Sequence, residues 1–193
     1  MAVNRGARIA LSLGILVALL GYALVVEFGV NAGRIHYGVE IRGDLAVGGM
    51  TPAEADDVLK ERAQLMLEDE IILGGQGVEV RFYPQAPELS TDDVLAAGWA
   101  PGRAATIEAA LAVGRDEGPF NAIAERWNAW MGGVKVGWKG HARAFRVTKI
   151  IDEVERLGQK RGLTVDRPAL RLKIRRALNS WPRRPFYRIP FSD

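Results

Sequence analysis

Residues 48–59 read GGMTPAEADDVL, and this stretch joins a turn to the beginning of a helix. Thr51 is a favourable N-cap, Pro52 suits the first helical position, and Glu54 completes a Thr-x-x-Glu capping box. Apolar residues then recur every three or four positions to about Glu68, which predicts an amphipathic helix. The stretch therefore predicts a sharp corner followed by a well-capped helix.

A glycine-rich turn before a helix is also the general form of a phosphate-binding loop, so this alternative needs a test. A Walker-type loop requires Gly-x-x-x-x-Gly-Lys-Ser/Thr, and a dinucleotide loop requires Gly-x-Gly-x-x-Gly after a strand. Residues 48–59 contain neither pattern. Glu54 also occupies the first turn, where it would repel an anion at the helix N-terminus. We interpret the stretch as a structural corner.

Strand and helix patterns alternate on both sides of this corner and predict an α+β fold. Period-two alternation and turn residues predict strands at 34–41, 70–73, 78–83 and 134–138. Helical spacing and capping residues predict further helices at 89–98, 105–115, 119–133, 148–160 and 171–180.

The N-terminal region carries an apolar segment, residues 9–26, with 18 residues and no charge. A helix of this length rises about 27 Å, close to the hydrocarbon thickness of a bilayer. We therefore predict a transmembrane signal anchor at 9–30, in contact with the lipid bilayer through residues 9–26. The basic residues 1–8 predict a cytoplasmic N-terminus, so the rest of the chain is expected outside the inner membrane. The alternative is a signal peptide cleaved near 30–32.

The composition leaves few residues for catalysis. The chain has no Cys and two His, so thiolate chemistry is excluded and any metal site would need mostly carboxylates. Asp56 and Asp57 are adjacent on a predicted helix, where neighbouring side chains point about 100° apart and make poor acid–base partners. We predict no enzyme activity, no metal and no cofactor.

Charge is distributed unevenly along the chain. Residues 1–139 hold 12 Lys/Arg and 18 Asp/Glu, a net charge of −6, whereas residues 140–193 hold 14 and 5, a net charge of +9. The change predicts a boundary near Gly140. We expect an α+β domain at 34–139, a basic helical segment at 140–180 and an extended tail rich in Pro and aromatic residues at 181–193.

The corner and its surroundings resemble one known family over roughly residues 37–140. The matching residues are Gly48, Gly49, Thr51, Glu54, Ala55 and Leu59, then Ala110, Val113, Gly114 and Arg115. In this order and spacing they are similar to the peptidoglycan-binding domain found N-terminal to VanW-type and some L,D-transpeptidase domains. The resemblance implies a bacterial, VanW-associated module that binds cell-envelope polymer. The Cys that the transpeptidase site requires is missing, so the resemblance implies no catalytic partner domain.

Three groups of residues are candidates for ligand binding. Arg115 lies at a predicted helix end, where it either caps the helix or binds carboxylates and phosphates. Trp127 and Trp130 share a helix face; this spacing favours core packing, and the alternative is stacking on sugar rings. The basic segment contributes the third group, Arg175, Arg176, Arg183 and Arg184.

The partner of the basic segment depends on where the chain lies. Nucleic acid is the usual partner of such a patch, but outside the membrane it is not available, so we expect no nucleic-acid binding. An anionic envelope polymer, anionic lipid or an acidic protein surface takes its place, and a merely solvated face is the alternative. Two functions follow: a non-enzymatic module that binds peptidoglycan-like polymer, or an accessory subunit of a larger membrane complex that docks through the soluble domain and tail.

Overall fold

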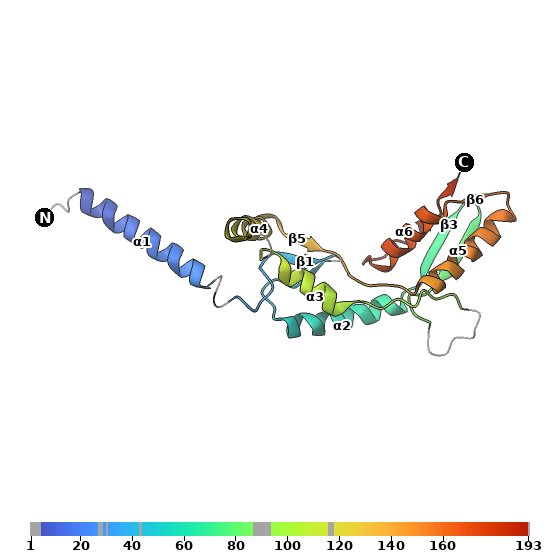
Figure 1. The fold of residues 1–193 in the computed structure, drawn as a ribbon, viewed down its shortest axis with the longest axis horizontal. Helices are drawn as coiled ribbons and strands as arrows, with labels where there is room; N and C mark the ends of the chain where they lie inside the picture. The colour runs from blue at the N-terminus through green and yellow to red at the C-terminus, as the bar shows by residue number, and fades with distance from the viewer. Residues whose placement is uncertain are drawn as a thin grey trace.

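The computed structural model describes residues 5–26, 29, 31–42, 44–86, 94–115 and 118–192. In chain order the elements are α1 (Arg5–Val25), β1 (Val39–Ile41), β2 (Leu45–Ala46), α2 (Pro52–Glu68), β3 (Ile71–Gly75), β4 (Val78–Phe82), α3 (Arg103–Ala112), α4 (Gly118–Gly132), β5 (Val134–Val136), α5 (Ala144–Gln159), β6 (Thr164–Val165), α6 (Arg167–Leu178), β7 (Tyr187–Arg188) and β8 (Phe191–Ser192). Short strands mixed with helices make this an α+β fold (Figure 1).

Helix α1 corrects the transmembrane prediction. Within the part of the chain that the structure describes, no helix is both long enough and apolar enough to cross a membrane. The first turn of α1 carries Arg5 and Arg8, which leaves an uncharged run from Ile9 to Val25 that is shorter than the about 20 residues a transmembrane helix usually needs. The predicted anchor at 9–30 and the inner-membrane location and outward orientation inferred from it are therefore wrong. Contact of residues 9–26 with a lipid bilayer stays a prediction.

The N-terminal lobe, defined here as β1, β2, β5, α3 and α4, is built on a three-stranded sheet. Its strand order is β2-β1-β5, with β1 antiparallel to β2 and parallel to β5. Helix α4 approaches the sheet closely at Gly38, which has φ +83°; a Cβ there would lie 2.0 Å from the carbonyl oxygen of Ala129. Glycine at this position therefore lets α4 pack against the chain before β1.

The C-terminal lobe, defined as β3, β4, β7, α5, β6, α6 and β8, contains the predicted hairpin. Strands β3 and β4 pair antiparallel, and Val78, Val80 and Phe82 are buried while Glu79 and Arg81 are exposed, as their alternation predicts. Strand β7, from the tail, joins β3 in parallel, and β8 pairs with β6. The tail therefore lies on the protein's own surface.

Helix α2 connects the two lobes along one side of the molecule (Figure 1). It contacts α3, and it buries Ala55, Leu59, Ala63 and Met66. These residues belong to one continuous apolar cluster that also contains side chains of both sheets and of α5 and α6. The two lobes consequently share a single core.

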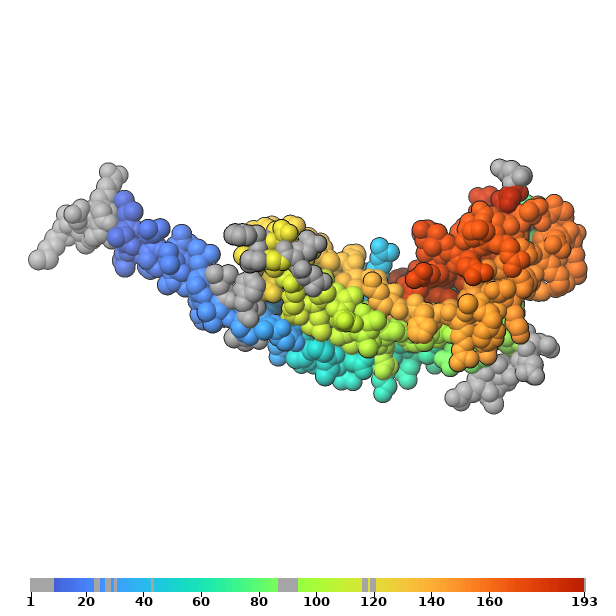
Figure 2. Space-filling view, in the orientation of Figure 1, coloured from blue at the N-terminus to red at the C-terminus, as the bar shows by residue number. Residues whose placement is uncertain are grey.

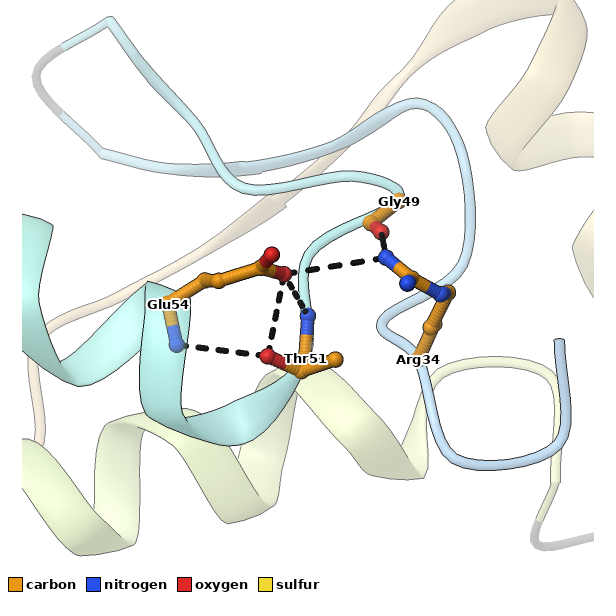
Figure 3. Close-up of polar contacts among 4 residues, drawn as sticks. All are labelled: Arg34, Gly49, Thr51 and Glu54. Carbon is orange, nitrogen blue, oxygen red and sulfur yellow. Dashed lines mark hydrogen bonds and ion pairs between the residues drawn. The ribbon is translucent and has the colours of Figure 1, made fainter.

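The corner at residues 48–59 has the predicted geometry (Figure 3). The Thr51 hydroxyl accepts from the Glu54 backbone N–H at 3.3 Å, and the Glu54 carboxylate accepts from the Thr51 backbone N–H at 2.7 Å. Arg34 donates to the Gly49 carbonyl at 2.8 Å and lies 3.6 Å from the Glu54 carboxylate. Because Glu54 is held by Thr51 and Arg34, the helix N-terminus is already occupied by an anion, and the capping-box prediction is confirmed.

One predicted helix is not observed in the residues that the structure describes. The proposed helix at 89–98 begins within residues 87–93, which lie outside the described residues, and residues 94–98 form no helix. Instead this segment runs alongside the hairpin, since the Tyr83 N–H donates to Leu95 and the Ala97 N–H donates to Tyr83. Backbone pairing with a neighbouring segment has replaced local helix formation.

Candidate functional site

A cleft of about 500 Å³ lies between the two lobes. One wall is α6 and the tail, and the other is the chain just after β1 and β5. The outline of the molecule is concave on this side, between α4 and α6 (Figure 2). Pockets of roughly 300–1,000 Å³ are typical of small-molecule and ligand-group sites, so the cleft is large enough for one or two chemical groups of a ligand.

The walls of the cleft are strongly cationic. Its described lining contains no Asp or Glu and five basic residues: Arg42, Lys173, Arg175, Arg176 and Arg184. Lys173 donates to the Arg188 carbonyl at 2.6 Å. Arg175, Arg176 and Arg184 are exposed residues and form no ion pair with any residue that the structure describes. Three free arginine side chains therefore surround one concave surface.

Helix α6 places these arginines because its two faces differ. Leu170, Ile174, Ala177 and Leu178 are buried in the core, so the intervening basic positions must face away from it. The helix is fixed at its start by Asp166, whose side chain accepts from the Ala169 N–H at 3.0 Å. Arg175 and Arg176 lie in its last turn, where a cation interacts favourably with the helix dipole.

A smaller cavity of about 240 Å³ adjoins this cleft and shares Arg175 and Asn179 with it. Trp138 lines the cleft and Trp99 lines the smaller cavity. Both indoles are buried, and their ring centroids are 6.5 Å apart. Three buried polar atoms here have no hydrogen-bond partner: Trp99 Nε1, Trp138 Nε1 and Asn179 Oδ1. These three atoms have almost no solvent-accessible surface, so they lie beneath the surface of the two cavities.

The structure brings together Arg175, Arg176 and Arg184 of the predicted binding residues, but it gives Arg183 a different role. The Arg183 side chain is only 4% exposed and donates to the backbone carbonyls of Met66 and Asp69 at the end of α2. Burial lowers the pKa of its guanidinium, and the nearby Asp69 carboxylate opposes that shift. Arg183 therefore attaches the tail to α2 and is not available to a ligand.

Arg115 also acts within the fold. Its guanidinium donates to the Leu111 carbonyl at 2.8 Å and to the Arg34 carbonyl at 2.6 Å. The first contact caps the end of α3, and the second joins α3 to the segment that precedes β1. The helix-capping alternative considered for this residue matches the contacts, and the ligand-binding alternative does not.

Trp127 and Trp130 lie on α4 and do not pack in the core. Their side chains are 59% and 63% exposed, so the favoured core-packing interpretation is wrong. The small residues Ala122 and Ala129 occupy the buried face of α4 instead. The two indole rings are 5.3 Å apart and tilted by 59°, and they form an exposed aromatic pair outside the cleft.

A second hollow, beside α2 and α3, is a weaker candidate. It measures about 820 Å³ and is lined by Asp56, Arg103 and Glu108 among apolar residues. Asp56 and Arg103 already form an ion pair at 2.9 Å, so the only basic residue in its described lining is neutralised within the protein. The cationic cleft is therefore the better candidate.

Six polar or aromatic residues of the cleft were not among the predicted binding residues: Arg42, Trp138, Lys173, Asn179, Ser180 and Tyr187. Arg42 and Asn179 are more than 130 positions apart, and no local pattern indicates that they meet. Among the described residues, no three His, Asp or Glu side chains gather as potential metal ligands. The absence of a metal, a cofactor and enzyme activity stays a prediction.

Comparison of the chain with models of known protein families, with curated proteins and with solved structures finds no match.

Proposed function

We propose that this protein is a non-catalytic module that binds an anionic, peptidoglycan-like polymer in the cationic cleft. The observation that supports the proposal most directly is the convergence of five basic residues on a cleft with no carboxylate in its described lining. The resemblance of the corner and of α3 to a peptidoglycan-binding family supports the polymer class. Stem peptides of such a polymer carry carboxylates, which the forked arginine side chain binds in bidentate geometry.

The electrostatics of the cleft favour an anionic ligand. Arg175, Arg176 and Arg184 repel one another in the free protein, and no described carboxylate offsets that repulsion. A polymer with repeated anionic groups would relieve it at several points along its length. Each exposed contact contributes little alone, about 0–1 kcal/mol, but several sites on a polymer combine through effective concentration.

Nucleic acid is the competing polyanion. Its exclusion depended on placing the chain outside a membrane, and that placement no longer stands. The concave cleft favours a narrow polymer with separate anionic groups over a duplex, whose phosphates form a broad convex surface. Nucleic acid therefore enters the test as a competitor.

The test is co-sedimentation of the full chain with insoluble peptidoglycan, in a mild non-ionic detergent because the described side chains of α1 are exposed and apolar. We expect the protein to pellet at low salt and the triple variant Arg175→Gln/Arg176→Gln/Arg184→Gln to stay largely in the supernatant. A matched control replaces Arg156, Lys160 and Arg161 by Gln, which removes the same charge outside both the cleft and its adjoining cavity. Equal pelleting of both triple variants, or release by nucleic acid at lower concentration than by soluble muropeptides, would contradict the proposal.

A second candidate is an accessory subunit of a larger complex, and α4 supports it. Ile123, Trp127, Trp130 and Met131 are 48–66% exposed on this helix, and clustered exposed apolar side chains are typical of protein contacts. Size analysis of the protein extracted gently from its native source distinguishes the two functions. A stable complex that the double variant Trp127→Ala/Trp130→Ala disrupts would favour the subunit function, whereas a monomer would exclude it.

A further inference from the structure

The smaller cavity beside the cationic cleft is cationic as well. Its lining includes Arg171, Arg175 and His141, and it contains no Asp or Glu among the residues that the structure describes. Arg171 and His141 are exposed, and their side chains form no hydrogen bond or ion pair with any described residue. The smaller cavity therefore adds an unpaired arginine to those that line the cleft.

Arg175 stands between the two hollows. It lines both of them, together with Asn179 at the C-cap of α6. Arg171 lines only the smaller cavity, whereas Lys173 and Arg176 line only the cleft. Residues four positions apart lie on the same side of a helix, about 6 Å apart along its axis, so Arg171 and Arg175 are neighbours. The basic residues of α6 form a row that leads from one hollow into the next.

The spacing of this row is set by the fold, and the floor of the smaller cavity is apolar. Leu170 and Ile174 are fully buried, so α6 is held firmly against the core. Trp99, Val147 and Leu178 line the smaller cavity and are at most 8% exposed. A cationic rim above an apolar floor suits an anionic group on a short apolar stem, because the stem covers the floor while the anion stays at the rim.

We propose that the two hollows are connected subsites for successive anionic groups of one ligand chain. One group lies in the cleft at Arg176 and Arg184, and the next lies in the smaller cavity at Arg171. Arg175 lies between the two groups and contacts both. This inference rests on the proposed function and refines it: the site recognises at least two neighbouring anionic groups of the polymer, and a ligand with one such group fills only one hollow.

The test measures how affinity depends on the number of anionic groups. The probes are N-acetylated, C-terminally amidated oligoglutamates of one, two, four and six residues, which carry one carboxylate per residue, and linear phosphates with the same numbers of phosphorus atoms. Calorimetry uses the full chain in non-ionic detergent at low salt. An extended peptide spans about 3.3 Å per residue, so four residues are enough to reach both hollows. We expect affinity to rise about tenfold from one to four residues, through effective concentration, and little from four to six.

Two variants remove the second subsite in different ways. Arg171→Gln removes the arginine that only the smaller cavity has, and Ala144→Phe fills that cavity without a change of charge. Each should weaken tetraglutamate about fivefold, which is the upper range for one exposed charge contact, and should leave the one-residue probe nearly unchanged because the cleft is intact. The matched control is Arg188→Gln, which removes an exposed arginine of β7 that lines neither hollow and should leave both probes nearly unchanged. Denaturant unfolding of each variant confirms that it folds.

The outcomes are distinguishable from those of the proposed function. Equal losses for Arg171→Gln and Arg188→Gln, or an affinity that does not rise with the number of groups, would overturn the two-subsite inference. Both results can occur while the protein still pellets with the polymer, which leaves the proposed function intact. Tighter binding of the phosphates, with the same losses in the variants, would support the two subsites and contradict a polymer bound through carboxylates. Loss of pelleting together with no binding of any probe would overturn both.

Discussion

Two adjacent arginines, Arg183 and Arg184, show how the surroundings of a residue decide its role. Arg183 is buried, and its guanidinium holds two backbone carbonyls at the end of α2. Arg184 is exposed and lines the cationic cleft. Removal of Arg183 breaks two hydrogen bonds within the protein, to the carbonyls of Met66 and Asp69, whereas removal of Arg184 leaves only solvated surface. The same side chain is structural at one position and available to a ligand at the next.

We therefore predict opposite effects for the two substitutions to Met. Arg183→Met should lower the free energy of unfolding by about 3 kcal/mol, since hydrogen bonds to charged groups contribute about 1.5–3 kcal/mol each. Arg184→Met should change it by less than about 0.5 kcal/mol, as is usual for surface substitutions, and should weaken polymer binding. Denaturant unfolding curves and the pelleting assay measure the two effects. A stable, poorly binding Arg183→Met variant would contradict the assignment.

At the scale of an element, helix α2 depends on its capping box, and this makes it sensitive to acid. The hydrogen bond from the Thr51 backbone N–H lowers the pKa of the Glu54 carboxyl, with smaller contributions from the Thr51 hydroxyl and from Arg34. A carboxyl group with a lowered pKa in the folded state stabilises the fold above its unfolded pKa, about 4.3. That stabilisation is lost as the pH falls from there through the lowered folded value.

The denaturant midpoint of the protein should therefore fall as the pH decreases below about 4.3, and Glu54→Gln should reduce the part of this dependence that comes from the capping box. Thr51→Ala removes the N-cap and should cost about 1 kcal/mol at neutral pH. The midpoint, followed by circular dichroism between pH 3 and 7 for the three proteins, tests the prediction. Identical pH profiles for the wild type and Glu54→Gln would show that Glu54 does not contribute.

Local patterns predicted the elements whose causes are local. The capping box, the alternation of the β4 strand and the apolar face of α6 each depend on residues within one or two turns of each other. The face of α4 was predicted wrongly because its spacing is compatible with either orientation. Ala122 and Ala129 pack on the body since Gly38 permits a close approach, and this places the larger side chains outside. The orientation of α4 is therefore set by tertiary packing and not by the periodicity of its sequence.

The orientation of α4 gives a direct prediction about tryptophans. Trp127→Ala and Trp130→Ala should each change the free energy of unfolding by less than about 0.5 kcal/mol, because both side chains are mostly exposed. Trp99→Ala should cost about 3–5 kcal/mol, because its side chain is only 2% exposed. Thermal unfolding of the three variants measures the difference. A large loss for Trp127→Ala would show that α4 packs with its aromatic face inward.

At the scale of the whole molecule, the cleft exists because distant segments meet. Strand β1 pairs with β5 almost a hundred residues later, and β3 pairs with β7 more than a hundred residues later. These parallel pairings bring Arg42 of the N-terminal lobe opposite α6 of the C-terminal lobe. The charge change near Gly140 indicated that the C-terminal region is basic. It did not indicate that residues of the N-terminal lobe would complete the cationic cleft.

A ligand in this cleft must contact both lobes, so it should stabilise the molecule as one unit. At a concentration 100 times its Kd, a ligand that binds only the folded state adds about 2.7 kcal/mol. We expect soluble muropeptides to raise the melting temperature of the wild type and not that of Arg175→Gln/Arg176→Gln/Arg184→Gln. Hydrogen exchange should slow in both β5 and α6 in the presence of the ligand, because the chain after β5 and the last turn of α6 form opposite walls. Protection confined to α6 would mean that the ligand binds the basic helix alone, and that the junction between the lobes is not the binding site.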